Sequence, residues 1–463
     1  MRRKSWQLAA VLGGLLLTHL ALAGAQPLWA EYVPGPKLSI VNNSGRPASQ
    51  IYLVFLARPY SETLSYNTHR IKWEDATFPI IDPADDTVTF GDYSYANYST
   101  TLDKLSRDPV TGNHYFFLPK KENAAVPNDK AGFDSGRLWL SFQTPTYFRV
   151  YNLPPPKGVG HLTYASPTFM DPSNPNATTV FDFFEPQLSV TPGGDICTVH
   201  ADTSNVESIA MPLLYQLYNG ETLVGNKTKG LNRSLRELRQ LFSADPVFYR
   251  LVTSVGIMAP GHGIELGKLS STYYTNYVDY CWQHWTDNPL TFEYPLGTTW
   301  TGGVVGDVLT LTGPQTVSIS RPPSQDVFFC SGVFDGPDEV DKAIKNQVVS
   351  ALNRTVMHLA PYPTGTKTHY PWESYKPPTG YKKDGQTFMF YQQNGLTSGN
   401  YQTNVYSKIL HQLSYDGTIY GFPYDDNADQ SSFIDGVATE IKLTIGNSQL
   451  STTETILSLL LLD

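Results

Sequence analysis

Apolar residues follow two patterns along the chain, and the first is that of short β-strands. Between residue 37 and about residue 220, runs rich in β-branched and aromatic residues are separated by Gly, Pro, Asn and Asp. The clearest runs cover 37–43, 50–59, 87–93, 136–142 and 146–152. Frequent turn signals between short strands are typical of antiparallel sandwiches and barrels. This part of the sequence therefore predicts an antiparallel β-sandwich or barrel.

A helical pattern begins after residue 230. Residues 234–237 have the capping-box sequence Ser-Leu-Arg-Glu, and the apolar positions that follow on one helix face are Leu235, Leu238, Leu241 and Phe242. A longer helix is expected within 336–359, where Pro337 suits the first turn and two acids follow it. Its predicted buried stripe consists of Val340, Ile344, Val348 and Leu352. A third helix is expected within 401–413.

Strand and turn signals return in 416–426 and 438–447. The order of strands, helices and strands predicts an α+β protein, in which a mixed α/β domain is inserted into a β-domain. We place a signal segment at 1–25, the β-domain at 26–225, the inserted domain at 226–414, and the return strands with the tail at 415–463. A loop rich in Pro and Gly at 361–387 is expected to cover or line the surface between the domains.

The first 25 residues have the layout of a secretory signal, with Arg2, Arg3 and Lys4 ahead of an apolar run and small residues at its end. An uncleaved anchor is the alternative, although the run is short for a membrane span and contains His19. Removing these three cations and no acid takes the formal charge from -9 to -12. This charge argues against nucleic acid or an anionic membrane as partner. We expect a secreted protein, extracellular or associated with a cell wall.

Cysteine and histidine usage gives no sign of a disulfide framework or a metal site. Cys281 and Cys330 could pair and leave Cys197 free, but spacing does not fix the connectivity. The three candidate ligands His200, His262 and Glu265 are scattered, which favours surface and loop roles. Glycosylation acceptors, which permit a secreted glycoprotein, occur at Asn42, Asn97, Asn176, Asn226, Asn232 and Asn353.

Aromatic residues make up 13% of the chain, and tyrosine is the most frequent of them. Tyrosine has a flat apolar ring with a polar tip, so it can stack on a sugar or serve an ordinary β-sheet. The segment 271–285 allows both interpretations, a stacking platform or core packing, for Tyr273, Tyr274, Tyr277, Trp282 and Trp285. Core packing is expected for at least half of them.

One glutamate stands in the strand-like stretch 178–189, TTVFDFFEPQLS. Alternation places Phe183, Glu185, Gln187 and Ser189 on one face of the strand. Pro186 cannot donate to a ladder, so this strand is predicted to be an edge strand or to carry a bulge. The apolar ring of Phe183 would favour a protonated carboxyl at Glu185.

A second acid follows in the strand-like stretch 200–215, where Asn205, Glu207 and Ile209 are expected to share a face. The glycines at 193 and 194 signal a turn, so the two stretches could pair as a hairpin with Glu185 and Glu207 on one face. Two carboxylates across a groove suit glycosidic hydrolysis, in which one donates a proton and its partner acts on water or on the sugar. Taken alone this pair is weak evidence, because 42 acids provide many such pairs.

Several segments in order resemble glycoside hydrolase family 64, the thaumatin-like β-1,3-glucanases of laminaripentaose-producing type. They are NPNATTVFDFFEPQL, ADTSNVESIAMPL, VFFCSGVFDG, SALNRTVM and YGFPYDDNADQSS, with GRLWLSFQTPTYFRVYN ahead of them. The likeness extends from about residue 38 to residue 446. It implies a thaumatin-like β-domain and a mixed domain on either side of a wide groove for a β-1,3-glucan chain. It also implies a monomeric, secreted endo-β-1,3-glucanase that inverts without a metal or cofactor.

The same resemblance implies the roles of individual residues. The family's general acid falls on Glu185, and its general base, an aspartate, falls on Glu207. Sugar contacts are expected from Gln187, Ser189, His200, Asp202 and Thr203, and from Asp425 and Asp426 in the segment YDDNADQ, which could instead form only a turn. Glutamate in place of aspartate at 207 and histidine in place of tryptophan at 200 depart from the family pattern. A non-catalytic β-glucan-binding wall protein is therefore the alternative.

Overall fold

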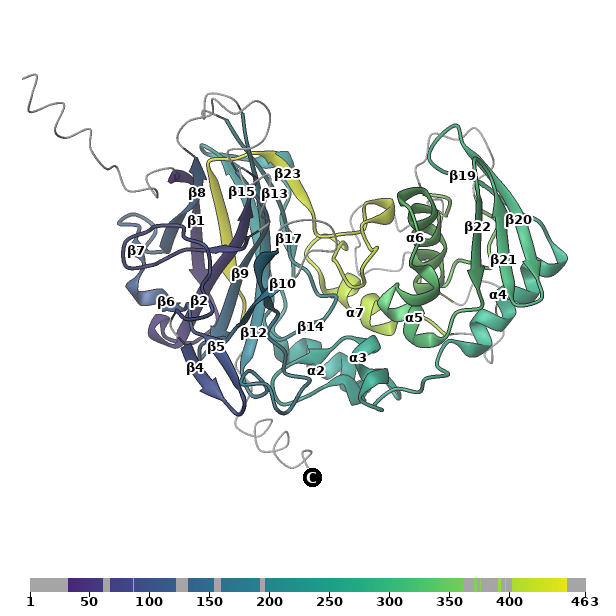
Figure 1. The fold of residues 1–463 in the computed structure, drawn as a ribbon, viewed down its shortest axis with the longest axis horizontal. Helices are drawn as coiled ribbons and strands as arrows, with labels where there is room; N and C mark the ends of the chain where they lie inside the picture. Colours follow the sequence, from purple (N-terminus) through teal and green to yellow (C-terminus); the bar gives the residue numbers. More distant parts are fainter. Residues whose placement is uncertain are drawn as a thin grey trace, which may run out of the picture.

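The computed structural model describes residues 32–60, 67–85, 87–121, 132–153, 160–191, 196–361, 370–372, 375, 390–392, 396 and 402–447. Figure 1 shows two halves, one made mainly of sheets and the other mainly of helices with a small sheet at its far side. The predicted signal segment 1–25, the turn at 193–194, most of the loop 361–387 and the tail after 447 lie outside the described residues.

Two open sheets form the β-rich half. The first has the order β16-β15-β24-β1-β8-β7, with β17 paired to β15, and the second has the order β23-β13-β12-β9-β2-β3, with β6 paired to β2. The expectation of a sandwich or barrel resolves as two stacked sheets, because neither order closes on itself. Their strands are β1 (Tyr32–Asn42), β2 (Ile51–Pro59), β3 (His69–Arg70), β6 (Thr100–Thr101), β7 (Ser106–Arg107), β8 (His114–Lys121), β9 (Phe133–Phe142), β12 (Val180–Val190), β13 (Cys197–Asp202), β15 (Leu213–Asn219), β16 (Thr222–Leu223), β17 (Lys229–Gly230), β23 (Ile434–Val437) and β24 (Glu440–Ile445).

Side chains that alternate along the strands fill the space between these sheets. In β24, Ile441, Leu443 and Ile445 are buried and the residues between them are partly exposed, as a period of two requires. From the facing sheet, Phe184 of β12 meets Tyr215 of β15 with ring centroids 5.0 Å apart. β24 lies parallel to β1 and antiparallel to β15, so a strand from the end of the chain completes the first sheet.

Smaller sheets surround this core and extend into the other half. They consist of β4 (Thr87–Phe90) with β5 (Tyr93–Ala96), β10 (Arg149–Leu153) with β11 (His161–Ala165), β14 (Ser208–Ile209) with β18 (Ile257–Met258), and the row β19 (Leu290–Glu293), β20 (Thr299–Val305), β21 (Val308–Thr312) and β22 (Thr316–Ser320). The predicted strands of 37–152 therefore exist, although 87–93 divides between β4 and β5.

Helices occupy the segment between the two groups of strands. They are α2 (Leu235–Ala244), α3 (Pro260–Glu265), α4 (Thr275–Asp287), α5 (Ser324–Phe329), α6 (Glu339–Asn353) and α7 (Val405–Leu413), with the 3-10 turns η1 (Ala48–Gln50), η2 (Leu102–Lys104), η3 (Val224–Asn226), η4 (Phe248–Leu251), η5 (Gly332–Phe334) and η8 (Asn427–Asp429). The capping box of α2 is present, since the Ser234 side chain accepts from Glu237 N and the Glu237 side chain accepts from Ser234 N. None of the described helices is long and apolar enough to cross a bilayer.

Four expectations about individual side chains need correction or refinement. Val340 lies outside the buried stripe of α6, with 45% of its surface exposed, whereas the other three stripe residues are buried. Tyr274, Tyr277, Trp282 and Trp285 are core residues, which excludes them from a stacking platform. The cysteines are all free, so Cys281 and Cys330 do not pair. Asn176 and Asn353 are fully buried and cannot accept a glycan in the folded state.

A second core joins the outer face of the β12 sheet to the helices. Trp139, Phe181 and Phe183 on that face belong to one buried cluster with Leu238 of α2 and Trp282 of α4. The cluster fixes the helical segment against the sheet, and it does so next to Glu185 on β12.

Candidate active site

A bulge in a central strand presents Glu185. β12 lies between β9 and β13, and its register with β9 jumps from Phe184 to Leu188. Pro186 falls in this gap, so the predicted bulge is confirmed and an edge position is wrong. Phe184 points into the sandwich core, while the Glu185 side chain keeps 26% of its surface exposed on the other face.

Arg137 of β9 holds Glu185. Its Nε donates to Glu185 Oε1 at 2.8 Å and its Nη1 donates to Ser166 Oγ at 3.3 Å. The guanidinium lies over the ring of Phe183, 5.0 Å from the centroid. The ring of Phe183 therefore packs against the guanidinium that binds Glu185, so the nearest partner of this carboxylate is a cation and not only an apolar ring.

The strand partner of Glu185 is a second carboxyl group, that of Asp202 on β13. Burial raises the pKa of Asp202 well above its usual range, and the charges of Glu185 and Asp426 add to this, against the opposing effect of Arg137. Oδ1 of Asp202 is buried and has no hydrogen-bond partner among the described residues. The protonated form of Asp202 is therefore favoured beside Glu185.

Glu207 reaches the site from a bend between β13 and β14. The hairpin of β12 and β13 is present, but β13 ends at Asp202, so the expected continuous strand through Glu207 is wrong. The Glu207 side chain is 59% exposed, and its Oε2 lies 2.5 Å from His262 Nε2. This hydrogen bond lowers the pKa of Glu207, although partial burial opposes the shift. His262 in turn bonds Glu265 Oε2 through Nδ1 at 2.8 Å.

A cavity of about 290 Å³ opens beside these groups. Its walls include Arg137, Trp139 and Phe183 from the sheet, the loop residues 166–170, and Glu207 with His262. Asp182 also lines it, but its carboxylate accepts from the backbone N–H groups of Ala210 and Met211. Burial raises the pKa of Asp182 to about 7, against these hydrogen bonds. No group of three His, Cys, Asp or Glu residues in the described chain is arranged to hold a metal.

The predicted sugar contacts on β12 and β13 lie on the same face as Glu185. Gln187 is opposite His200 and Ser189 is opposite Thr198. His200 stacks on Phe433 with ring planes 17° apart, and its Nδ1 bonds Asp435 Oδ1 at 2.8 Å. Gln187 donates to the hydroxyl of Tyr60. These side chains extend a polar surface with aromatic rings away from the bulge.

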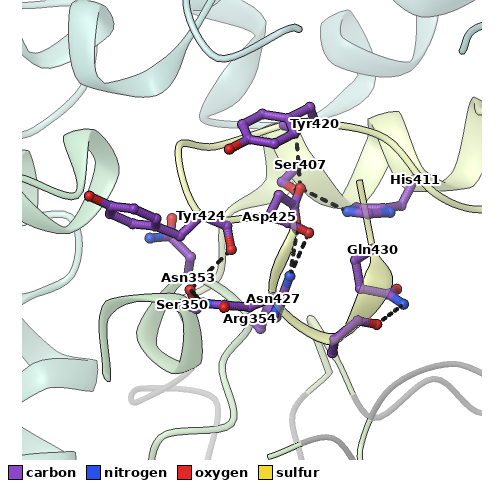
Figure 2. A network of polar contacts seen from close by, with 12 residues as sticks. Ser350, Asn353, Arg354, Ser407, His411, Tyr420, Tyr424, Asp425, Asn427 and Gln430 are labelled. Carbon is purple, nitrogen blue, oxygen red and sulfur yellow. Dashed lines mark hydrogen bonds and ion pairs between the residues drawn. The ribbon is translucent and has the colours of Figure 1, made fainter. Parts of the chain in front are cut away.

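Thr203 and Asp425 do not belong to this surface. The hydroxyl of Thr203 is buried and bonds Ser432 Oγ at 3.1 Å. Figure 2 shows Asp425 between Arg354 and His411, and both carboxylate oxygens are engaged at 2.9 and 3.0 Å. Because neither residue has an exposed polar tip, the expectation that they contact sugar is corrected. Asp426, in contrast, is exposed.

A family model described as Beta-1,3-glucanase, that of glycoside hydrolase family 64, matches residues 96–445. The chain belongs to this family. A glucan endo-1,3-beta-glucosidase of Cellulosimicrobium cellulans is 28% identical over 182 residues, which cover 38% of this chain and 28% of that protein. The enzyme of the same name from Arthrobacter sp. (strain YCWD3) is 26% identical over the same shares. The matched segment thus spans under a third of the length of these relatives.

Solved family 64 structures have the same fold. A β-1,3-glucanase domain from Clostridium beijerinckii has a TM-score of 0.66 at 22% identity, covering 91% of this chain and 100% of that one. A laminaripentaose-producing β-1,3-glucanase solved with laminaritetraose has a TM-score of 0.65 at 20% identity, covering 90% and 99%. The resemblance first found in short sequence segments is therefore confirmed over most of this family 64 chain.

Three residues next to the candidate acids of this family 64 chain, Arg137, His262 and Glu265, were not assigned to the site from the sequence. Arg137 is a lone cation in the apolar run 136–142, and that isolation was a signal that could have been followed. His262 and Glu265 were considered too scattered to act together, yet they are three residues apart on α3 and both point to one side. What joins them to Glu207 is a contact across 55 residues, which local spacing does not contain.

Proposed function

We propose that the protein is a secreted endo-β-1,3-glucanase that cleaves its substrate by a single inverting displacement. The observation that carries the proposal is the pair of accessible carboxylates, Glu185 and Glu207, both close enough to Arg137 to be influenced by its charge, in a family 64 fold. The charge of Arg137 acts on both, since it pairs with the first and lowers the pKa of the second after the larger effect of His262. Two acids that differ in environment suit the two roles of glycosidic hydrolysis.

Glu185 is proposed as the general acid. Arg137 Nε donates to Oε1 at 2.8 Å, so the acid role requires bound glucan to separate Oε1 from the guanidinium. The raised pKa of Asp202, across the strand pair, disfavours a second negative charge next to Glu185. Once protonated, Glu185 transfers its proton to the departing glycosidic oxygen as the bond to the anomeric carbon breaks.

Glu207 is proposed as the general base. His262 keeps it ionised through Oε2, while Oε1 has no hydrogen bond to the described residues and is open to a water molecule. That water attacks the anomeric carbon and gives its proton to Oε1, so the proton lost by Glu185 is balanced by the one gained here.

The surface beyond Glu185 is proposed to bind the glucan chain. Gln187, Ser189 and Asp426 offer polar groups, and the stacked rings of His200 and Phe433 offer a flat face for the C–H side of a sugar. In this proposal the sheets of 32–230 and 434–445 form a thaumatin-like domain, and the helical segment is an inserted domain that supplies the opposite wall of the groove. We further propose that the protein is a monomer. The signal segment 1–25 would direct its secretion, and it would be glycosylated on the way.

The test uses laminarin and curdlan as substrates. Wild-type protein is expected to release reducing ends, and Glu185→Gln and Glu207→Gln are each expected to lose at least about 100-fold in kcat. NMR of freshly released product should show the α-anomer, because inversion of a β-linkage gives it. A freshly released β-anomer would contradict single displacement, and unchanged rates in both variants would contradict the assigned roles.

A glucan-binding protein without turnover is the second candidate. The observation in its favour is that both carboxylates are already engaged, Glu185 by Arg137 and Glu207 by His262. Retention of wild-type protein on insoluble curdlan without any released sugar would support this candidate against the first.

A further inference from the structure

The helix that carries His262 is fixed to the backbone of Glu207. Ala259 N, at the start of α3, donates to Glu207 O at 2.9 Å, and the strands on either side pair as Ser208 with Met258 and Ile209 with Ile257. α3 is therefore attached to the chain at the point from which the Glu207 side chain leaves. Backbone hydrogen bonds therefore set the position of His262 relative to the Glu207 carboxylate, independently of the contact between the two side chains.

Close packing leaves α3 little room to move. A Cβ atom on Gly261 would lie 2.7 Å from the ring of Phe329, and one on Gly263 would lie 2.4 Å from Leu251. Phe329 also stands edge-on to the imidazole of His262, with ring centroids 5.1 Å apart and planes at 74°. The two glycines on either side of His262 allow this approach, and the approach sets the plane of the ring.

Two carboxylates hold the ring from opposite edges. Nε2 meets Glu207 Oε2 at 2.5 Å and Nδ1 meets Glu265 Oε2 at 2.8 Å. Only a protonated imidazole donates at both nitrogens. Burial disfavours the charged ring, but the hydrogen bonds and charges of Glu207 and Glu265 outweigh it and raise the pKa of His262. The remaining charge that acts on Glu207 is that of Arg137, which also stabilises its ionised form.

We propose that His262, held by Glu265, is a positioning residue that fixes Glu207 as the base of the reaction, an inference that rests on the function proposed above. A glutamate side chain has three rotatable bonds, and an exposed one samples many conformers. Anchoring Oε2 to a rigid imidazole selects one conformer and directs Oε1 to the cavity. The base is then in place before substrate arrives.

The arrangement predicts a particular pH dependence. While the ring is charged, it donates to both glutamates. As pH rises through the raised pKa of His262, the ring loses one proton and keeps a single N–H, so it can no longer donate to both. Glu207 then competes with Glu265 for this N–H and loses its anchor in the tautomer protonated at Nδ1, so kcat falls while binding of glucan is retained.

The decisive experiment compares His262→Gln, His262→Ala and Glu265→Gln with wild type by kcat and KM on laminarin across the acidic, neutral and alkaline range. His262→Gln is expected to lower kcat at least about tenfold, a part of the 10²–10⁴-fold that a general base supplies, with KM within about twofold. Glu265→Gln keeps a hydrogen-bond partner but removes a charge, so it should move the alkaline limb of kcat to lower pH. His284→Gln on α4, which lies away from the cavity, is the matched control and should change nothing.

A second measurement reports on the ring without any turnover. The pKa of His262, followed by NMR of its Cε1–H signal, is expected above the usual value in wild type and to fall in both Glu207→Gln and Glu265→Gln. Wild-type kcat and an unmoved alkaline limb in His262→Gln, on a protein that hydrolyses laminarin, would overturn the inference. Absence of hydrolysis by wild type would instead overturn the proposed function, and a raised, glutamate-dependent pKa of His262 in that protein would show that the pair exists apart from catalysis.

Discussion

Arg137 Nε lies 2.8 Å from Glu185 Oε1, and the same guanidinium lies 5.0 Å above the ring of Phe183. Pro186 lies where the pairing of β12 with β9 is interrupted, and Arg137 of β9 pairs there with Glu185. The bulge, the cation and the acid are one structural unit. A substitution in any of them should change the position or the hydrogen bonding of the Glu185 carboxylate.

Replacing Arg137 tests this unit. Arg137→Gln removes the cation that orients Glu185 and favours the ionised form of Glu207, so kcat/KM on laminarin is expected to fall about tenfold or more. Arg58→Gln is the matched control, because Arg58 is also a strand arginine beside an aspartate, Asp134 at 3.5 Å, but is more exposed. Equal effects of the two substitutions would contradict a specific role for Arg137.

Two aspartates with raised pKa values, Asp202 and Asp182, should respond in opposite ways to conversion into asparagine. Asp202 has its pKa raised in the folded state, so wild type loses stability as pH rises from the unfolded pKa of about 4 through the folded pKa. Asp202→Asn removes this dependence. It should match wild type near the acid end of that range and exceed its free energy of unfolding at about pH 7.

Asp182→Asn is the contrasting change. The Asp182 carboxylate accepts from three backbone N–H groups, those of Phe183, Ala210 and Met211, and an amide –NH₂ cannot replace an acceptor oxygen there. A loss of about 1–3 kcal/mol in the free energy of unfolding is expected. Denaturant unfolding of both variants at the two pH values provides the measurement, and a stabilised Asp182→Asn protein would refute the account.

Of the two ion pairs compared in the helical half, the buried pair of Arg354 and Asp425 (Figure 2) should lose more stability when it is broken. Arg354 and Asp425 have no exposed side-chain surface, and the rings of Tyr370, Phe390 and Phe422 surround the guanidinium. Asp425→Asn leaves a buried cation without its counter-charge and should cost about 3–5 kcal/mol in unfolding. Asp279→Asn, which breaks the exposed pair with Arg321 at 3.0 Å, should cost less than about 1 kcal/mol.

The hydrogen bond between His262 and Glu207 should also make the free energy of unfolding depend on pH. Glu207 has a lowered pKa, so its contribution is present above its unfolded pKa and is lost as pH falls through the folded one. His262 has a raised pKa, so its contribution is present below its unfolded pKa and is lost as pH rises through the folded one. The difference in unfolding free energy between wild type and His262→Gln should be largest between these limits and shrink on both sides. A difference independent of pH would indicate lost packing alone.

Local sequence patterns were sufficient to predict many of the strands and helices and to place Glu185 on the correct face of its strand. The period of two along 180–190 correctly separated Glu185 from Phe184, because the two faces of β12 meet different surroundings. It failed at Glu207, since Thr203 N donates to the hydroxyl of Ser432 and Asn205 N donates to Tyr420 O, and these contacts interrupt the strand. These partners are more than 200 residues away in the chain, and composition near residue 207 does not encode them.

Side-chain environments were predicted less well than elements, for a related reason. The aromatic segment 271–285 could pack inward or face a ligand, and only the presence of α6 and the small sheet beside α4 decides for the core. Arg137 lies in the predicted strand 136–142 and received no role from the sequence, and its contact with Glu185 depends on a bulge in a neighbouring strand. In both cases the deciding information lies in a partner element.

The parallel placement of β24 between β1 and β15 has a consequence for biosynthesis. Residues 37–42 emerge from the ribosome among the first of the β-rich half, but the neighbour they need on one side is 440–445. Until that segment is made, two hydrogen-bonding edges in the middle of the sheet stay open to other chains. A nascent or truncated polypeptide without residues 440–445 should therefore require chaperone protection. In the full-length chain, insertion of β24 between β1 and β15 pairs both edges at once.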